Sequence, residues 1–201
     1  YYTSKISENE NWKNYQIQVI RDLERFLELL IEKQSISSAY STLWNEKGVN
    51  VGIDGMPPYK TELAGVPQVC FKVPTGGGKT FLAANSIKPI FDSMPHIHPK
   101  AVVWLVPSDA ILTQTYRTLT DENHDYRKKI DVDFGNKVEI YSKQQLLNGQ
   151  NFNPTSVSDN LSVFVLSYDS FRTSKKDGRK AYQENGSLLS FCLLYTSPSP
   201  R

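Results

Sequence analysis

The sequence predicts an α/β fold with a mainly parallel sheet. Short apolar runs, each about the length of one strand, alternate with segments whose apolar residues recur every three or four positions. The strongest of these runs are continuous rather than alternating, which is typical of parallel strands covered on both faces. Strands and helices that alternate along a chain usually form a parallel sheet with helices packed against it.

Four apolar runs are the expected strands. The first is expected to be buried, the second and fourth are strong, and the third is weaker. Turn-forming residues separate them from the segments that follow. In chain order the expected strands are Val69 to Val73, Ala101 to Val106, Val138 to Tyr141 and Leu161 to Ser167.

The expected helices lie before and between these strands. Residues 12–33 carry one apolar stripe opposite a charged face, which indicates a packing helix. A connector rich in Ser, Gly, Pro and Asn follows, with one short helix around Ser38 to Trp44. Pro89 must kink or end the helix after the first strand, and Ser108 is a good N-cap for the helix after the second. A further short helix is expected near Gln144 to Leu147.

A glycine-rich loop joins the first expected strand to its helix. Its backbone N–H groups can close around phosphate oxygens, Lys79 would reach the β- and γ-phosphates, and the Thr80 hydroxyl would hold Mg²⁺. The strict G-x-x-x-x-G-K-[ST] pattern has Gly at the position of Val73, so a glycine turn followed by a chance Lys-Thr is the alternative. We predict an ATP and Mg²⁺ site formed by Thr75, Gly76, Gly77, Gly78, Lys79 and Thr80.

Composition and charge narrow the class of protein. The 201 residues are 39% apolar and 22% charged, as in a folded domain. No apolar run approaches the roughly 20 residues that span a bilayer, and the start has no signal-peptide layout, so we expect a cytoplasmic protein without membrane partners. The net charge of +2 means that any nucleic-acid surface must be local. Cys70 and Cys192 have no metal-binding spacing, and Cys70 is expected to be an inert core thiol.

The order of four motifs resembles the first RecA-like domain of superfamily 2 helicases and translocases. The motifs are V-P-T-G-G-G-K-T, L-V-P-S-D-A-I-L-T-Q, I-Y-S-K-Q-Q-L and V-L-S-Y-D-S-F. Within that superfamily the chain is most similar to the restriction subunit of type III restriction–modification enzymes, over residues 12–190. The resemblance implies an incomplete RecA-like P-loop NTPase domain, from a parent ATP-dependent DNA translocase or helicase that is a hydrolase with endonuclease activity.

The resemblance also implies roles for single residues. Gln16, in N-Y-Q-I-Q-V-I, matches a glutamine that recognises adenine, although a surface glutamine on a helix is the alternative. Two further motifs would contact the sugar–phosphate backbone of double-stranded DNA, and a modification methyltransferase subunit is the implied partner. The residues concerned are Pro107, Ser108, Thr113 and Gln114 in one motif, and Ser167, Tyr168 and Ser170 in the other.

These motors bind Mg²⁺ and orient the attacking water through a D-E-x-H motif that directly follows an apolar strand. We find no stretch of this sequence with that combination. Residues 121–124 spell D-E-x-H but follow a helical pattern, so we predict a loop there. In the family the motif would follow the Ser167–Phe171 region by a few dozen residues. We therefore assign no catalytic residue and expect this piece to bind ATP without hydrolysing it.

We divide the chain into an N-terminal helix and connector (1–66), a partial ATP-binding domain (67–191) and a tail (192–201). The tail resembles a translated sequencing adapter, with a genuine Ser-Pro linker as the alternative, and the missing Met indicates that the natural start lies upstream.

His96 and His98 have no third metal ligand, and the basic runs at 127–129 and 175–180 are interpreted as solvated surface. Two other functions stay open, a superfamily 2 helicase acting on DNA or RNA without a nuclease, and a nucleotide-binding switch without a motor.

Overall fold

The computed structural model describes residues 12–61, 64–148 and 160–168. The chain divides into two compact units, Tyr1–Met94 and Pro95–Arg201. The glycine loop and the helix after it therefore belong to the same unit as the first helix, and the boundary predicted between residues 66 and 67 falls inside that unit. The division into an N-terminal region and a partial ATP-binding domain stays a prediction, as does the nature of the tail, which lies outside the described residues.

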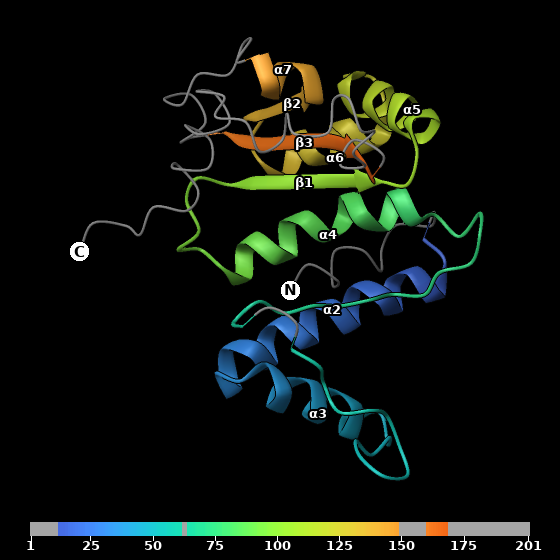
Figure 1. Ribbon diagram of the computed structural model, residues 1–201, viewed down its shortest axis with the longest axis vertical. Helices are drawn as coiled ribbons and strands as arrows, with labels where there is room; N and C mark the ends of the chain where they lie inside the picture. Colours follow the sequence, from blue (N-terminus) through green and yellow to red (C-terminus); the bar gives the residue numbers. More distant parts are fainter. Residues whose placement is uncertain (1–11, 62–63, 149–159, 169–201) are drawn as a thin grey trace, which may run out of the picture. The chain divides into compact units, whose positions relative to one another are not determined.

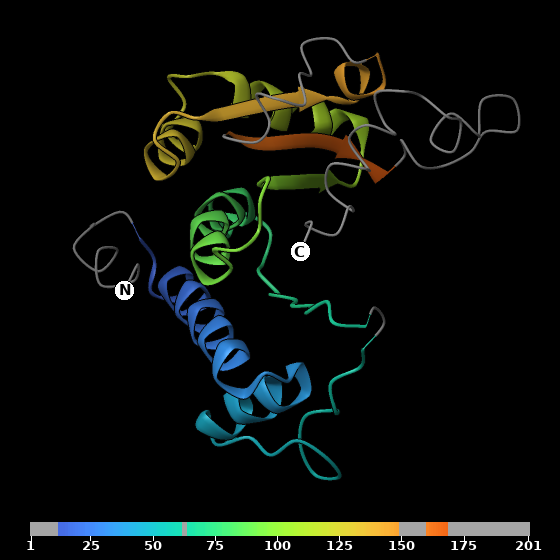
Figure 2. The same ribbon diagram turned by 90° about the vertical axis from the view of Figure 1, so that its left-hand side faces the viewer.

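The first unit is built on one long helix. This helix, α2 (Asn14–Lys33), contacts both α3 (Ile36–Glu46) and α4 (Lys79–Ser93) (Figures 1 and 2). All three helices were predicted. The prediction for α3 was shorter than the observed helix, and the prediction for α4 did not fix where the helix ends. Ser35 caps α3, since its hydroxyl accepts a hydrogen bond from the backbone N–H of Ser38 at 3.3 Å.

Two apolar clusters attach α2 to its neighbours. Near the start of α2, Ile20 packs with Leu82 of α4, and Val73 and Trp12 border the pair. Towards its end a second cluster joins α2 to α3 and consists of Phe26, Leu29 and Ala39. Burial of these side chains is the main stabilising term, because a helix of this length is marginal in water by itself.

α4 continues through Pro89 to Ser93, so of the two predicted effects of Pro89, a kink or an end of the helix, the end does not occur. Proline removes one backbone donor and crowds the preceding turn, at a cost of about 3 kcal/mol in a helix interior. Pro89 is buried, and a buried helix can recover such a cost through packing.

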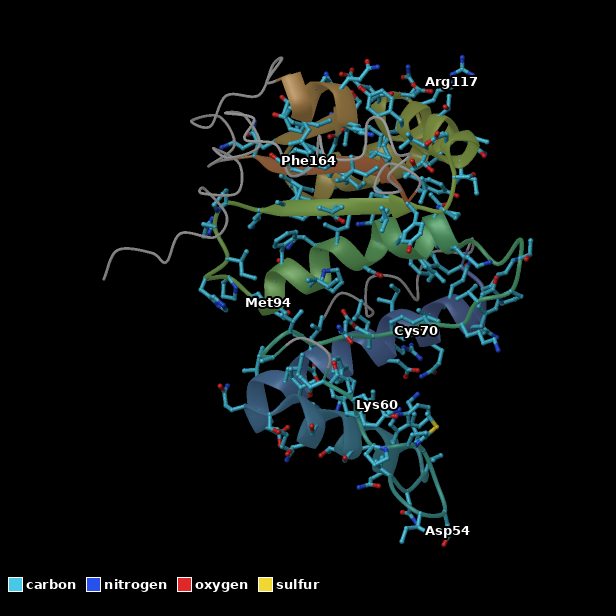
Figure 3. The ribbon with its side chains drawn as sticks, viewed as in Figure 1. Asp54, Lys60, Cys70, Met94, Arg117 and Phe164 are labelled. Carbon is cyan, nitrogen blue, oxygen red and sulfur yellow. The ribbon has the colours of Figure 1, made fainter. Side chains whose placement is uncertain are left out.

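The expected strand from Val69 to Val73 is not formed. The stretch is extended and pairs with no strand among the residues that the structure describes, and 52% of Val69 and 38% of Phe71 are exposed. Cys70 is exposed as well, so its assignment to the core is also wrong (Figure 3). An apolar run favours extended backbone, but a strand requires a neighbour that completes its ladder of hydrogen bonds.

The second unit contains a three-stranded parallel sheet, which confirms the predicted α/β class. The sheet order is β1-β3-β2, and both neighbouring pairs are parallel. All seven residues of the central strand β3 are buried, among them Phe164 (Figure 3). The Phe164 ring stacks on that of Tyr141 of β2 with ring centroids 5.2 Å apart. The three strands are β1 (Ala101–Val106), β2 (Val138–Ser142) and β3 (Leu161–Ser167).

β1 is an edge strand of the described sheet and differs from the prediction. Two alternate side chains, Val103 and Leu105, are 56% and 50% exposed, so β1 is not covered on both faces. Three helices accompany the sheet, and α5 and α7 contact its strands. They are α5 (Asp109–Thr120), α6 (Asp125–Asp133) and α7 (Lys143–Asn148), of which α6 was not predicted because only Ile130 of it is buried.

The D-E-x-H segment is a loop between α5 and α6, as predicted. Asp121 ends α5 and accepts a hydrogen bond from the N–H of Asn123 at 3.0 Å, while His124 Nδ1 accepts one from Tyr126 at 3.2 Å and caps α6. These side chains therefore serve local backbone geometry. In the part of the chain that the structure describes, none of the helices has the length and apolar character needed to cross a membrane.

Candidate nucleotide-binding site

The glycine loop lies between the extended stretch and α4, and its shape depends on two different uses of glycine. Gly76 and Gly78 have left-handed φ angles of 76° and 79°, which residues with a Cβ rarely adopt. Gly77 is buried, and a Cβ on it would lie 2.6 Å from Val73 Cγ1 and 2.9 Å from the Pro74 oxygen. Val73, the departure from the strict motif, thus packs directly on the loop.

The start of α4 supplies the polar groups of the loop. Gly78 is its N-cap, so the first backbone N–H groups of the helix have no acceptor within the helix. The Lys79 ammonium is exposed and donates to the Pro74 carbonyl at 3.0 Å, a carbonyl that also accepts from the Gly77 N–H at 3.0 Å. Thr75 is exposed beside the glycines, and Thr80 is half-buried in the first turn of α4. Free amides, a helix N-terminus and one ammonium form a site suited to phosphate.

Gln16 lies against this loop, 94% buried in the first turn of α2. Its Oε1 accepts from the Lys13 N–H at 3.0 Å, and its Nε2 donates to the Gly77 carbonyl at 3.2 Å. Gln16 is therefore not a surface glutamine, and both ends of its amide are already engaged. Each end retains one further donor or acceptor position, so recognition of adenine stays a prediction.

Tyr15, the neighbour of Gln16, is a contact that sequence reasoning missed. Its hydroxyl donates to the same Gly77 carbonyl at 2.9 Å, although the ring is 38% exposed. In the sequence Tyr15 is one more member of the apolar stripe of α2, and no spacing rule distinguishes a tyrosine whose hydroxyl reaches a loop 62 residues away. Only the fold brings the two together.

The residues predicted to contact nucleic acid lie in the second unit, after the ends of β1 and β3 and, for Thr113 and Gln114, within α5. Pro107, Thr113, Gln114 and Tyr168 are exposed, and Ser108 is half-buried. Ser108 is the N-cap residue of α5, as predicted, and its carbonyl accepts the first helical bond from the Leu112 N–H at 2.9 Å, but its hydroxyl makes no capping bond. The exposed side chains can reach a ligand from solvent.

Ser167 differs from these residues. Its side chain is fully buried and its hydroxyl donates to Asp109 Oδ1 at 2.5 Å. A direct phosphate contact by Ser167 is thus corrected to an internal bond, because the hydroxyl of the last residue of β3 faces the start of α5. Ser170 lies outside the described residues.

Other candidates from the sequence have structural roles or none. His96 and His98 are exposed, and among the described residues no three His, Cys, Asp or Glu side chains group to hold a metal ion. Arg127 donates to Asp131 and to two backbone carbonyls, and Lys129 pairs with Asp133. The basic run 127–129 is therefore largely paired within α6 and its surroundings, while the run at 175–180 and Cys192 lie outside the described residues.

One family of known proteins matches most of the chain. The family model for the type III restriction enzyme, res subunit, covers residues 9–192 and so includes the glycine loop, both strand-end motifs and α2. No curated protein and no solved structure matches the chain. Given a parallel α/β sheet and a phosphate-type loop at the start of a helix, the chain belongs to the family of type III restriction enzyme res subunits.

Proposed function

We propose that this chain binds ATP for an ATP-dependent DNA translocase or helicase of the type III restriction class. The observation that carries the proposal is the glycine loop, with two left-handed glycines and an exposed Lys79 at the N-terminus of α4. Backbone amides and one ammonium are donors suited to the oxygens of a phosphate chain.

Thr80 is the proposed Mg²⁺ ligand. It lies one residue after Lys79 in the first turn of α4, and a hydroxyl oxygen is a hard donor of the kind Mg²⁺ prefers. Bound Mg²⁺ would neutralise charge on the β- and γ-phosphates, with the remaining ligands from phosphate and water. The chain's own contribution is to hold and orient the phosphates through the loop.

The strand ends of the second unit, together with the first half of α5, are the proposed contact with double-stranded DNA. Thr113, Gln114 and Tyr168 are exposed there and carry hydroxyl and amide groups that bond phosphate oxygens without reading sequence. Family membership supports a modification methyltransferase subunit as partner and a nuclease in the complete enzyme, and both belong to the proposal.

Replacing Lys79 tests the phosphate role. Lys79→Ala in the full-length protein should lower ATP turnover by about 10²–10³-fold, since one charged donor to the reacting phosphates is lost. Lys88→Ala is the matched control, because Lys88 is on the same helix and pairs with Asp92 one turn further on. The measurement is phosphate release with and without double-stranded DNA.

Comparing phosphate release with and without double-stranded DNA distinguishes a translocase from a nucleotide-binding switch. Stimulation by double-stranded DNA is expected of a translocase, and its absence would favour a nucleotide switch. Equal turnover in the Lys79 and Lys88 variants would refute the phosphate role of the loop.

A further inference from the structure

Two side chains from the first turn of α2 donate hydrogen bonds to one carbonyl of the glycine loop. The Gly77 oxygen lies 2.9 Å from the Tyr15 hydroxyl and 3.2 Å from Gln16 Nε2. A carbonyl oxygen has two lone pairs, so both of its acceptor positions are filled from α2. The loop is thus held at one peptide group by two residues that are adjacent in the sequence.

Holding this carbonyl fixes the direction of a neighbouring amide. The peptide bond between Gly77 and Gly78 is planar and trans, so its C=O and N–H point in opposite directions. Since the carbonyl points at α2, the Gly78 N–H points away from α2. Gly78 is the N-cap of α4, at the position where helix N-termini bind anions.

Glycine needs such a restraint more than any other residue. Gly76 and Gly78 adopt left-handed φ angles, but glycine populates other regions about as readily, so without external bonds the peptide between Gly77 and Gly78 can turn over. A turned peptide would present an oxygen where a phosphate requires a donor. The two bonds from α2 oppose that change.

The surroundings show that the fit between α2 and the loop is close. Gln16 Nε2 lies 2.7 Å from where a Cβ of Gly78 would be, and the Lys13 N–H holds the other end of the Gln16 amide. The Trp12 ring meets Phe81 of α4 edge to face, with centroids 4.5 Å apart. The residues at the start of α2 therefore contact both the loop and the first turn of α4.

We propose that Tyr15 is a positioning residue for nucleotide binding, which with Gln16 holds the Gly77–Gly78 peptide in the orientation that accepts phosphate. This inference rests on the proposed nucleotide function and adds a residue and a mechanism to it. The contact acts on the phosphate-binding loop and not on a base. Loss of this contact must therefore weaken the binding of every ligand that carries a polyphosphate chain, whatever base is attached.

Removing the Tyr15 hydroxyl tests the inference. In the full-length protein, Tyr15→Phe should raise the Kd for ATP and for inorganic tripolyphosphate by the same factor, about three- to tenfold, as expected for one hydrogen bond. KM for ATP should rise in parallel while kcat stays unchanged, because Tyr15 touches no reacting atom. Titration calorimetry gives both affinities, and steady-state kinetics gives the split between KM and kcat.

Tyr40→Phe is the matched control. The Tyr40 hydroxyl also donates to a backbone carbonyl in the first unit, that of Pro57 at 3.1 Å, but on the α3 side. Its removal should leave both affinities unchanged. Replacement of Tyr15 by 4-aminophenylalanine, which returns a donor to the same place, should restore binding.

The outcomes separate this inference from the function it depends on. If the unaltered protein binds both ligands, Lys79→Ala binds neither, and Tyr15→Phe behaves like Tyr40→Phe, then Tyr15 has no positioning role and the nucleotide site stands. A loss confined to ATP, with tripolyphosphate unaffected, would also overturn the inference, since Tyr15 would then act at the base. If the unaltered protein binds neither ligand, the nucleotide function itself fails and the inference fails with it.

Discussion

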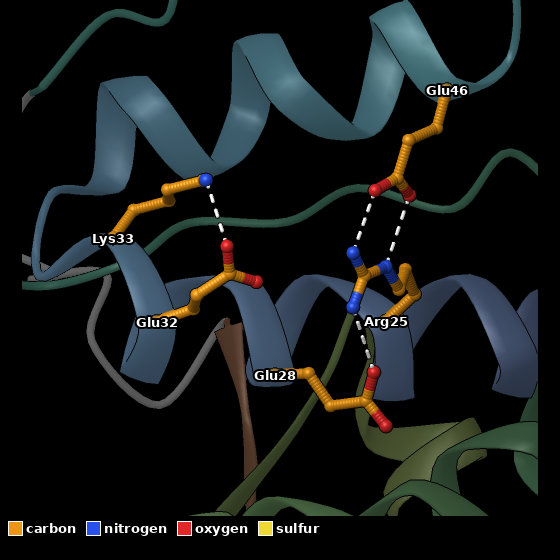
Figure 4. Close-up of polar contacts among 5 residues, drawn as sticks. All are labelled: Arg25, Glu28, Glu32, Lys33 and Glu46. Atoms are coloured by element: carbon orange, nitrogen blue, oxygen red, sulfur yellow. Dashed lines mark hydrogen bonds and ion pairs between the residues drawn. The ribbon is translucent and has the colours of Figure 1, made fainter.

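The two ends of α2 are attached to their neighbours by different chemistry. The first turn holds the glycine loop through neutral hydrogen bonds from Tyr15 and Gln16. Further along, Arg25 makes two bonds to Glu46 of α3, at 2.9 and 2.6 Å, and one to Glu28 at 3.0 Å (Figure 4). Lys47, just after α3, pairs with Asp22 of α2 at 2.6 Å.

This difference predicts which end responds to solution conditions. Exposed ion pairs are weakened by salt, while a neutral hydrogen bond next to a buried amide is not. The loop is thus held by bonds that are independent of ionic strength, whereas contacts to DNA phosphates are strongly salt-dependent. Salt should therefore weaken the pairing of Arg25 with Glu46 more than the contact of Tyr15 and Gln16 with the loop.

The largest effect should come from the apolar clusters at each end. Ile20 and Leu29 are both fully buried in α2, the first against Leu82 of α4 and the second beside Phe26 and Ala39. Truncation of either to Ala should lower the free energy of unfolding by about 2–5 kcal/mol, through lost burial and a residual cavity. Only Ile20→Ala should also raise the Kd for ATP, because only that cluster supports the helix of the glycine loop.

Thermal melts and ATP titrations at a temperature where both variants are folded provide the measurement. Ile20→Val, with an expected cost of about 0.5–1.5 kcal/mol, is the milder form if the alanine variant does not fold. Equal ATP affinity in the Ile20 and Leu29 variants would show that the two ends of α2 are functionally alike.

A smaller effect should follow from Gly78→Ala. Gly78 and Gly65 share left-handed φ angles of 79° and 74°, so alanine at either should cost about 1–2 kcal/mol of stability. Gly65 has open space around it, whereas a Cβ at Gly78 would lie 2.7 Å from Gln16 Nε2. Gly78→Ala should therefore also displace Gln16 and weaken ATP binding, while Gly65→Ala should not.

Calorimetric titration of both glycine variants with ATP checks this expectation. A Gly78 variant that loses no more affinity than the Gly65 variant would mean that the contact between Gln16 and the loop has no part in binding.

The same contrast explains what the sequence could predict. The glycine loop is built from backbone, and its residue types are dictated by φ angles and helix capping, so its place and shape follow from local rules. The strand β3 was located because complete burial gives it a strong apolar run, while β2, with one exposed residue among its buried ones, gives a weaker pattern. α6 was missed because Ile130 is its one buried residue and gives no periodic signal.

The failures have a common physical origin in contacts between distant residues. Val69 to Val73 has the composition of a strand, but composition alone does not determine whether a neighbouring strand lies beside it. Ser167 has the residue type of a phosphate contact, but its hydroxyl faces Asp109, 58 residues away. Tyr15 has the spacing of a core residue, yet it acts through its hydroxyl. Residue type predicts what a group can do, and only packing decides which partner it has.

The smallest effect is expected at the charged end of α2. The hydrogen bond from Arg25 lowers the pKa of the Glu46 carboxyl below its usual range, while the bonds from Glu46 and Glu28 raise the pKa of Arg25 above its ordinary value. Arg25 is charged throughout, so the titration belongs to Glu46. A carboxyl with a lowered folded pKa stabilises the fold above its unfolded pKa, and that contribution is lost as the pH falls through the folded pKa.

Glu46→Gln should therefore lower Tm by about one to three degrees at about pH 7, and the difference from the unaltered protein should shrink as the pH falls through the lowered pKa of Glu46. Asp54→Asn is the control, because Asp54 is an exposed carboxylate of the same unit that forms no ion pair with the residues that the structure describes. The Kd for ATP should be unchanged in both variants, since neither touches the first turn of α2. If Glu46→Gln weakened ATP binding, the ion pair between α2 and α3 would influence the glycine loop through α2. The two ends would then have to be treated as one coupled element.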